Sequence, residues 1–249
     1  MKAIPKLTIC TLLVLLISVS ASAQKIMKLD NSLKAKSEPM EAKRKGVSTI
    51  GKYQYGPYKI VSGKAGWTKS KSSKRFLSFE TETESKKKSS FVFVANDKDS
   101  VLVNTATNTK SKETSIGNFS NLNKSSDNYI VLISPVNDTS EWKMFMAYNS
   151  GSEVDGNFKS DGTLTDGIAN IEIRAVKQWD DGEGASFKMI IGYEFYLESQ
   201  AIAAVQASID TFKKKYVWLD KNLSEHMKLV LAAASASLLL HVDDEMAKP

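Results

Sequence analysis

The chain has 249 residues, of which 42% are hydrophobic and 25% are charged, with a net charge of +6 at pH 7. These values are typical of a folded globular protein and exclude disordered, collagen-like and multi-span membrane chains. The excess of positive charge is small, so nucleic acid is a poor candidate partner and none is expected.

The first 23 residues have the pattern of a secretory signal peptide. Lys2 and Lys6 form a basic start, residues 8–19 form an almost unbroken apolar run, and the Ala-Ser-Ala of residues 21–23 supplies the small side chains that signal peptidase requires. The apolar run is shorter than the ~20 residues that cross a bilayer. We therefore predict cleavage before Gln24, and a protein that is secreted or placed in the periplasm or cell envelope.

The only cysteine, Cys10, lies within this leader. A mature chain without cysteine has no disulfide, no thiolate metal site and no cysteine nucleophile. Its stability is expected to depend on the hydrophobic core alone, and a chain of this size buries about 70% of its unfolded surface.

Residues 24–46 are rich in Lys, Ser, Glu and Ala and contain few large apolar side chains. Such a segment buries too little apolar surface to offset the entropy lost on ordering, so it predicts a flexible basic arm. The alternative is a short helix over residues 38–45, capped by Ser37 with Pro39 in its first turn.

Residues 47–249 predict a single β-rich domain. Apolar and polar residues alternate with a period of two, and polar turn signals recur between the alternating segments. The intervals are too short for the crossover helices of a parallel sheet, so the predicted fold is mainly β, an antiparallel barrel or sandwich. Residues 84–88 predict a polar turn and residues 110–127 a long loop. The expected strands are residues 53–61, 75–83, 91–94, 101–103, 129–134, 142–148, 168–176 and 187–197.

Three Asp-Gly pairs, at residues 155–156, 161–162 and 166–167, suggest a calcium loop at first sight. An EF-hand-like loop starting at Asp155 would need oxygen ligands at its third and fifth positions and glycine at its sixth. Lysine occupies the fifth position and serine the sixth. Asp-Gly is also a common turn dipeptide, so we predict tight turns and no metal site.

Residues 200–216 fit two structures. A helical spacing of three and four residues joins Ile202, Val205, Ile209, Phe212 and Tyr216. Residues 201–207 can equally pair with the aromatic strand before them. Both structures stay open on this pattern alone.

A C-terminal helix is predicted over residues 222–242, because Asn222 and Glu225 have the spacing of a capping box. From Leu229 to Leu240 no residue is charged, so the helix has no polar face and must be buried on all sides or lie in a membrane. This stretch rises about 18 Å, less than the roughly 30 Å of a hydrocarbon core. The helix is therefore expected inside the protein, with no transmembrane span in the mature chain.

The C-terminal part of the chain resembles the tubby-like group, which includes the LURP-one-related and phospholipid scramblase proteins. The likeness consists of Gly-Tyr-Glu-Phe-Tyr-Leu at residues 192–197, Ile-Ala-Ala-Val at 202–205, Tyr-Val-Trp-Leu-Asp at 216–220 and the apolar residues 228–240. It implies a closed antiparallel barrel with the hydrophobic helix threaded through it, and it favours strands over residues 201–207 and 211–219. Those families are largely intracellular, and no phosphoinositide-binding residue of tubby proteins can be placed on this chain.

Evidence for catalysis is sparse. No serine-hydrolase, zinc-peptidase or P-loop motif occurs. His226 and His241 are about 22 Å apart along the predicted helix, too far to share a metal, and each is expected to be a capping or surface residue. Glu82 and Glu84 share one face of a strand, which leaves open a hydrolase with an unrecognised acidic site. We expect no enzyme activity and no cofactor.

A surface for binding is the more concrete hypothesis. Aromatic residues beside cations suit sugars or lipid headgroups, although basic clusters are also common as solvated turns. We expect an exported, non-enzymatic barrel that binds an anionic lipid, a polysaccharide or another envelope component; a structural envelope protein is a further alternative. The candidate binding residues are Trp67, Arg75, Lys86, Lys87 and Lys88.

Overall fold

The computed structural model describes most of the chain after the predicted leader. The predicted signal peptide, residues 1–23, and the candidate residue Arg75 lie outside the described part. The described residues are 25–45, 50–74, 80–116, 119–136, 138–150, 159–184, 189–207 and 214–246.

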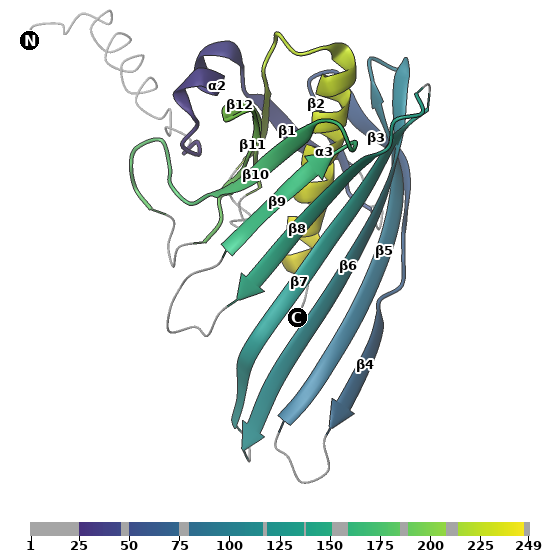
Figure 1. Ribbon diagram of the computed structural model, residues 1–249, viewed down its shortest axis with the longest axis vertical. Coiled ribbons are helices and arrows are strands. Elements are labelled where there is room, and N and C mark those ends of the chain that lie inside the picture. The colour runs from purple at the N-terminus through teal and green to yellow at the C-terminus, as the bar shows by residue number, and fades with distance from the viewer. Residues whose placement is uncertain are drawn as a thin grey trace, which may run out of the picture.

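The described residues form thirteen strands and two helices, shown in Figure 1. The helices are α2 (Asn31–Lys36) and α3 (Glu225–Met246). The strands are β1 (Met40–Lys45), β2 (Lys52–Tyr55), β3 (Tyr58–Ala65), β4 (Lys69–Lys74), β5 (Glu80–Ala95), β6 (Asp99–Ile116), β7 (Phe119–Pro135), β8 (Trp142–Ser150), β9 (Lys159–Thr165), β10 (Asn170–Val176), β11 (Gly192–Leu197), β12 (Gln200–Gln206) and β13 (Lys215–Leu219).

The strands form a closed antiparallel barrel. Their order in the sheet is β3-β2-β1-β13-β12-β11-β10-β9-β8-β7-β6-β5-β4, and an additional pairing of β3 with β5 closes the ring. Twelve strands make up the barrel, and β4 lies outside the ring on β5. The predicted antiparallel barrel is confirmed, in its closed form rather than as a sandwich.

Alternation along the strands places one face of each in the core. On β8, Trp142, Met144 and Met146 are buried, whereas the intervening Lys143 and Phe145 are exposed. On β10, Ile171 and Ile173 are buried in the same way. This period of two is the pattern from which the strands were predicted.

Helix α3 occupies the inside of the barrel, where Figure 1 shows it in yellow within the ring of strands. The side chains from Val230 to Leu239 are completely buried, including Ser235 and Ser237. The hydroxyls of these two serines donate to helix carbonyl oxygens, those of Leu231 and Ala234, at 2.8 and 2.7 Å. The predicted buried C-terminal helix is therefore confirmed.

The start of this helix differs from the prediction. It begins at Glu225 rather than at residue 222, and the hydroxyl of Ser224 accepts a hydrogen bond from the Met227 amide at 3.2 Å. Ser224 is therefore the N-cap. The amide of Asn222 instead donates to the Asp220 carboxylate at 2.9 Å, in the turn before the helix.

The last turn of α3 is acidic, and the barrel wall supplies the cations that compensate it. Asp243 pairs with Lys215 of β13 and lies 3.4 Å from Arg44 of β1, and it accepts the hydroxyl hydrogen of Tyr53 at 2.8 Å. Carboxylates at a helix C-terminus are destabilising, because they lie at the negative end of the helix dipole. Cations on β1 and β13 thus hold this end of the helix against the wall.

The predicted flexible arm over residues 24–46 is wrong for residues 25–45. Met27, Leu29 and Leu33 pack with Trp179 and Trp218 in a second hydrophobic cluster on the outside of the barrel. These few apolar residues suffice because the folded barrel already offers them an apolar surface, which an estimate from the segment alone does not include.

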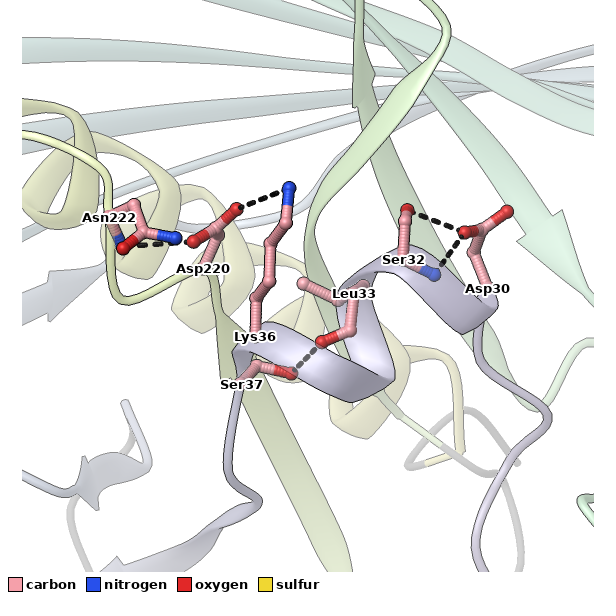
Figure 2. A network of polar contacts seen from close by, with 7 residues as sticks. All are labelled: Asp30, Ser32, Leu33, Lys36, Ser37, Asp220 and Asn222. Atoms are coloured by element: carbon pink, nitrogen blue, oxygen red, sulfur yellow. Dashed lines mark hydrogen bonds and ion pairs between the residues drawn. The ribbon is translucent and has the colours of Figure 1, made fainter.

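Polar contacts fix the same segment. Buried Gln206 accepts the Met27 amide at 2.9 Å, and buried Glu194 accepts the Asp30 amide at 2.6 Å. Figure 2 shows the Asp30 carboxylate capping α2 through Ser32, and Lys36 reaching Asp220 at 3.8 Å.

The alternative helix over residues 38–45 is also wrong. Residues 40–45 form β1, which pairs with β13 through Met40↔Val217 and with β2 through Arg44↔Tyr53. Pairing on both edges closes a gap in the barrel, and this tertiary context overrides the local helix signal.

Two predicted connections are strands instead. Residues 84–88 lie within β5, which runs without interruption, and residues 110–127 contribute to β6 and β7. Because these strands continue beyond the barrel, both of their faces meet solvent there, and the polar sequence carries no apolar alternation.

Two further predictions concern residues 200–216 and the Asp-Gly pairs. Residues 200–206 and 215–219 form β12 and β13, so the preference for strands is confirmed there. The Asp-Gly pair at 166–167 forms a turn, and the pair at 155–156 lies outside the described residues. The pair at 161–162 lies within β9, and the predicted turn is wrong there, because a bare Gly162 allows close approach to Met146.

Candidate binding surface

Four strands continue past the end of the barrel as a sheet of their own. Strand β3 pairs with β5 only as far as Ala65↔Ser89, after which β4 takes its place from Lys69↔Lys86 onward. On the other side β8 pairs with β7 only to Ser150↔Ser125. Figure 1 shows β4, β5, β6 and β7 projecting below the barrel. We call this four-stranded sheet the extension.

A bulge marks the point where the extension leaves the barrel. Residues 66–68 lie opposite only Lys87 and Lys88 of β5, since the pairs on either side are Ala65↔Ser89 and Lys69↔Lys86. A side chain on Gly66 would put its Cβ 1.8 Å from the Lys88 carbonyl oxygen, so glycine is required. Trp67 follows directly and is 91% exposed.

Lysines gather on one face of the extension. Lys69 lies directly opposite Lys86, and Lys71 lies opposite Glu84, which in turn lies opposite Lys110 of β6. Residues that face each other across strands share a face of the sheet, as do residues two apart along a strand. Alternation continues from the buried Phe91 and Phe93, so this face extends the outer surface of the barrel. We call it the basic face: Lys69, Lys71, Lys86, Lys88 and Lys110.

The basic face has little internal compensation. Lys86 lies 3.1 Å from Glu84. Within the described part of the chain, the other four lysines have no carboxylate within the 4.0 Å of an ion pair. The hydrogen bond from Lys86 lowers the pKa of Glu84, and the positive charges of Lys86, Lys110 and Lys71 add to this effect. Glu84 is therefore an ionised carboxylate surrounded by the ammonium groups of lysines.

An open hollow of about 700 Å³ lies on the extension. Its lining residues are all lysine, glutamate, serine or threonine. The Ser72 and Thr83 hydroxyls lie 3.2 Å apart on the face opposite the lysines. The lining residues are Lys71, Ser72, Ser73, Glu82, Thr83, Glu84, Lys110, Ser111 and Ser126.

The structure brings together some of the residues singled out from the sequence. The register places Trp67 in the bulge opposite Lys87 and Lys88, next to the Lys69↔Lys86 pair. Lys87 points to the opposite face, where its ammonium lies 2.8 Å from Asp244 of α3. Lys87 therefore stabilises the helix end and is not part of the basic face.

Sequence reasoning missed Lys110 as part of the site, whereas Lys69 and Lys71 stand out in the sequence as basic residues that follow Trp67. Lys110 falls in the predicted loop over residues 110–127. Its cross-strand neighbours are defined only by the pairing of β5 with β6 over their full length, which the sequence alone does not show. The run Lys-Ser-Lys at residues 69–71 indicates that both lysines share one face of a strand, because side chains alternate between the faces with a period of two.

Glu82 and Glu84 share a face of the extension. A general acid needs a raised pKa, so the lowered pKa of Glu84 does not suit that role.

The histidines give no support for catalysis either. His226 is partly exposed, with Nδ1 lying 3.6 Å from Asp138 at the edge of a smaller hollow of about 260 Å³. His241 is buried inside the barrel and stacks on Tyr129 at 4.2 Å between ring centres, so its predicted place at the surface is wrong. The tyrosines of the barrel wall supply an aromatic surface that the sequence of the helix alone does not show.

The described residues hold no group of three or more His, Cys, Asp or Glu side chains arranged to bind a metal ion. Within the same part of the chain, no helix combines the length and apolar character needed to cross a membrane. No protein-family model, curated protein or solved structure matches the chain.

Proposed function

We propose that this chain is an exported, non-enzymatic barrel protein that binds an acidic polysaccharide on the basic face of its extension. The observation that carries the proposal is Trp67, which is 91% exposed beside the basic face, where four of the five lysines have no ion-pair partner among the described residues. An aromatic ring packs against the apolar face of a sugar, and ammonium groups bind its acidic substituents.

Neither the exposed Trp67 nor the cluster of lysines stabilises the fold. A fully exposed tryptophan buries almost no apolar surface, so it adds little to stability. Lys69 directly opposite Lys86 is a like-charge pair across strands, which is destabilising. Departures from local rules concentrate at functional sites, which supports a role in binding.

A polysaccharide fits this surface better than an anionic bilayer does. Ser73 and Ser126 line the hollow on the same face as the lysines, and their hydroxyls match the hydroxyl groups of sugars. Glu82 and Glu84 lie among the lysines and would repel a dense layer of anionic headgroups.

The test measures binding of the mature chain, starting at Gln24, to immobilised acidic polysaccharides and to vesicles of anionic phospholipid at low and high salt. We expect polysaccharide binding that Lys86→Glu and Lys88→Glu each weaken about tenfold, a change of 1.4 kcal/mol. Added salt should weaken it too. Lys143→Glu is the matched control, because Lys143 is exposed on β8 and the charge change is the same.

Three outcomes would overturn the proposal. Binding to neither probe, or equal binding by the Lys88→Glu and Lys143→Glu variants, would return the lysines to solvated surface residues. Tighter binding to vesicles than to polysaccharide would assign the surface to membranes instead.

Export is part of the proposal and has its own test. Residues 1–23 should be absent from material recovered outside the cytoplasm, and N-terminal sequencing that begins at Met1 would contradict this. The closed barrel and its internal helix agree with the resemblance to the tubby-like group, which remains a proposal.

A further inference from the structure

The row of side chains across β4, β5 and β6 has a charge order of its own. Lys71, Glu84 and Lys110 lie directly opposite one another in register, so the row alternates positive, negative, positive. Neighbouring strands are about 4.8 Å apart, which separates the two lysines by about 9.6 Å with the carboxylate midway.

Each position in this row selects a different chemical group. The ammonium groups of Lys71 and Lys110 bind anionic substituents. The Glu84 carboxylate accepts hydrogen bonds and repels anions, so it favours a hydroxyl group. Its ion pair with Lys86 uses one carboxylate oxygen, and a carboxylate has about four acceptor sites, so capacity to accept remains.

A linear polysaccharide that contacts all three side chains must place an anionic group at each lysine and a neutral hydroxyl at Glu84. Its acidic groups must be about 9.6 Å apart, twice the strand spacing, with a neutral hydroxyl-bearing unit between them. Two successive sugars span a distance of this order. A polymer with an acidic group on every sugar would place an anion on Glu84.

We infer that the Lys71–Glu84–Lys110 row selects acidic polysaccharides in which charged and neutral sugars alternate, over polymers charged at every sugar. This inference rests on the proposed function, and it adds the ligand class that the basic face discriminates.

The experiment compares two carboxylated polysaccharides as oligosaccharides of equal sugar number, with the full mature chain at one ionic strength. Hyaluronan carries a carboxylate on alternate sugars, and polygalacturonate carries one on every sugar. We expect hyaluronan to bind about tenfold more tightly, a difference of 1.4 kcal/mol. Glu84→Lys should abolish or reverse that ratio.

The ratio of the two affinities is the measured quantity, because Glu84→Lys raises the positive charge and strengthens binding of any polyanion. Glu172→Lys on β10 is the matched control, since Glu172 is an exposed carboxylate paired with Arg174. It should leave the ratio unchanged. Circular dichroism of the variants confirms that each is folded.

The outcomes separate this inference from the proposed function. Equal binding of the two oligosaccharides, a preference for polygalacturonate, or a ratio that Glu84→Lys leaves unchanged would overturn the alternation rule while the basic face remains a binding surface. Binding of neither oligosaccharide would overturn both.

Discussion

The hydroxyl of Tyr129 on β7 donates a hydrogen bond to the carbonyl oxygen of Ser237 on α3, with 2.9 Å between the oxygens. Tyr55 on β2 makes the same kind of bond to the Ala232 carbonyl, more than one helical turn away. Burial raises the pKa of both tyrosines, so both hydroxyls remain protonated donors. The barrel wall thus fixes the position of the helix at two levels.

Tyr129→Phe removes the bond to Ser237 and leaves the ring in place. We expect the free energy of unfolding to fall by about 1 kcal/mol, the net contribution of a buried hydrogen bond. Denaturant unfolding followed by circular dichroism measures it. Tyr58→Phe is the control, because Tyr58 is buried but its hydroxyl makes no hydrogen bond within the described residues. Equal effects of the two changes would contradict a specific role for the Tyr129 hydroxyl.

The buried helix gives a second prediction. Leu231→Ala should destabilise the protein by about 2–5 kcal/mol, through lost burial and a residual cavity. Ala233→Asp should prevent folding, because it places an unpaired carboxylate at a completely buried position inside the barrel. Removing residues 222–249 should leave an aggregated β-rich product. A truncated protein that unfolds cooperatively, with a midpoint close to that of the full chain, would show that the helix is not part of the core.

These residues illustrate why the core could be predicted from the sequence. The segment from Leu229 to Leu240 has no charged residue, and a helix without a polar face is stable in water only when it is buried on all sides. The alternation of apolar and polar residues with a period of two predicts strands such as β8 and β10. Both signals arise wherever a solvent side and a core side differ.

The N-terminal segment and the extension lack that difference. Met27, Leu29 and Leu33 are too sparse to predict order, and their packing surface exists only after the barrel has folded. In the extension both faces are polar, so residues 110–127 have no apolar period. For the same reason the basic face was only partly predicted: register, not sequence spacing, brings Lys110 opposite Glu84.

The cap of α2 gives a pH-dependent prediction. The hydroxyl and amide of Ser32 donate to the Asp30 carboxylate at 2.6 and 2.8 Å, and these bonds lower the pKa of Asp30. A lowered pKa in the folded state adds stability above the unfolded value of about 3.9, and this is lost as pH falls through the folded value. Asp30→Ala should remove about 1 kcal/mol at neutral pH.

The measurement for Asp30 is the difference in unfolding free energy between the wild-type protein and the Asp30→Ala variant. That difference should shrink as pH falls below about 3.9. A difference that stays constant down to about pH 2.5, or grows in acid, would show that the ionised carboxylate does not stabilise α2.

The last prediction separates the position of Trp67 from the charge of the basic face. In Gly66→Ala the new methyl group would meet the Lys88 carbonyl oxygen at 1.8 Å, so the backbone of the bulge must shift and carry Trp67 with it. We expect weaker polysaccharide binding, of the same size as for Trp67→Ala, with every lysine retained. Stability should change by less than for Gly192→Ala, where the added Cβ would meet the Val205 carbonyl oxygen of β12 at 2.1 Å inside the barrel wall. Gly184→Ala is the control, because its Cβ would meet nothing within 4 Å. The contrary outcome is wild-type binding by Gly66→Ala together with impaired binding by Trp67→Ala. It would mean that Trp67 contributes to binding even when the backbone of the bulge has shifted, so the bulge does not position it for the ligand.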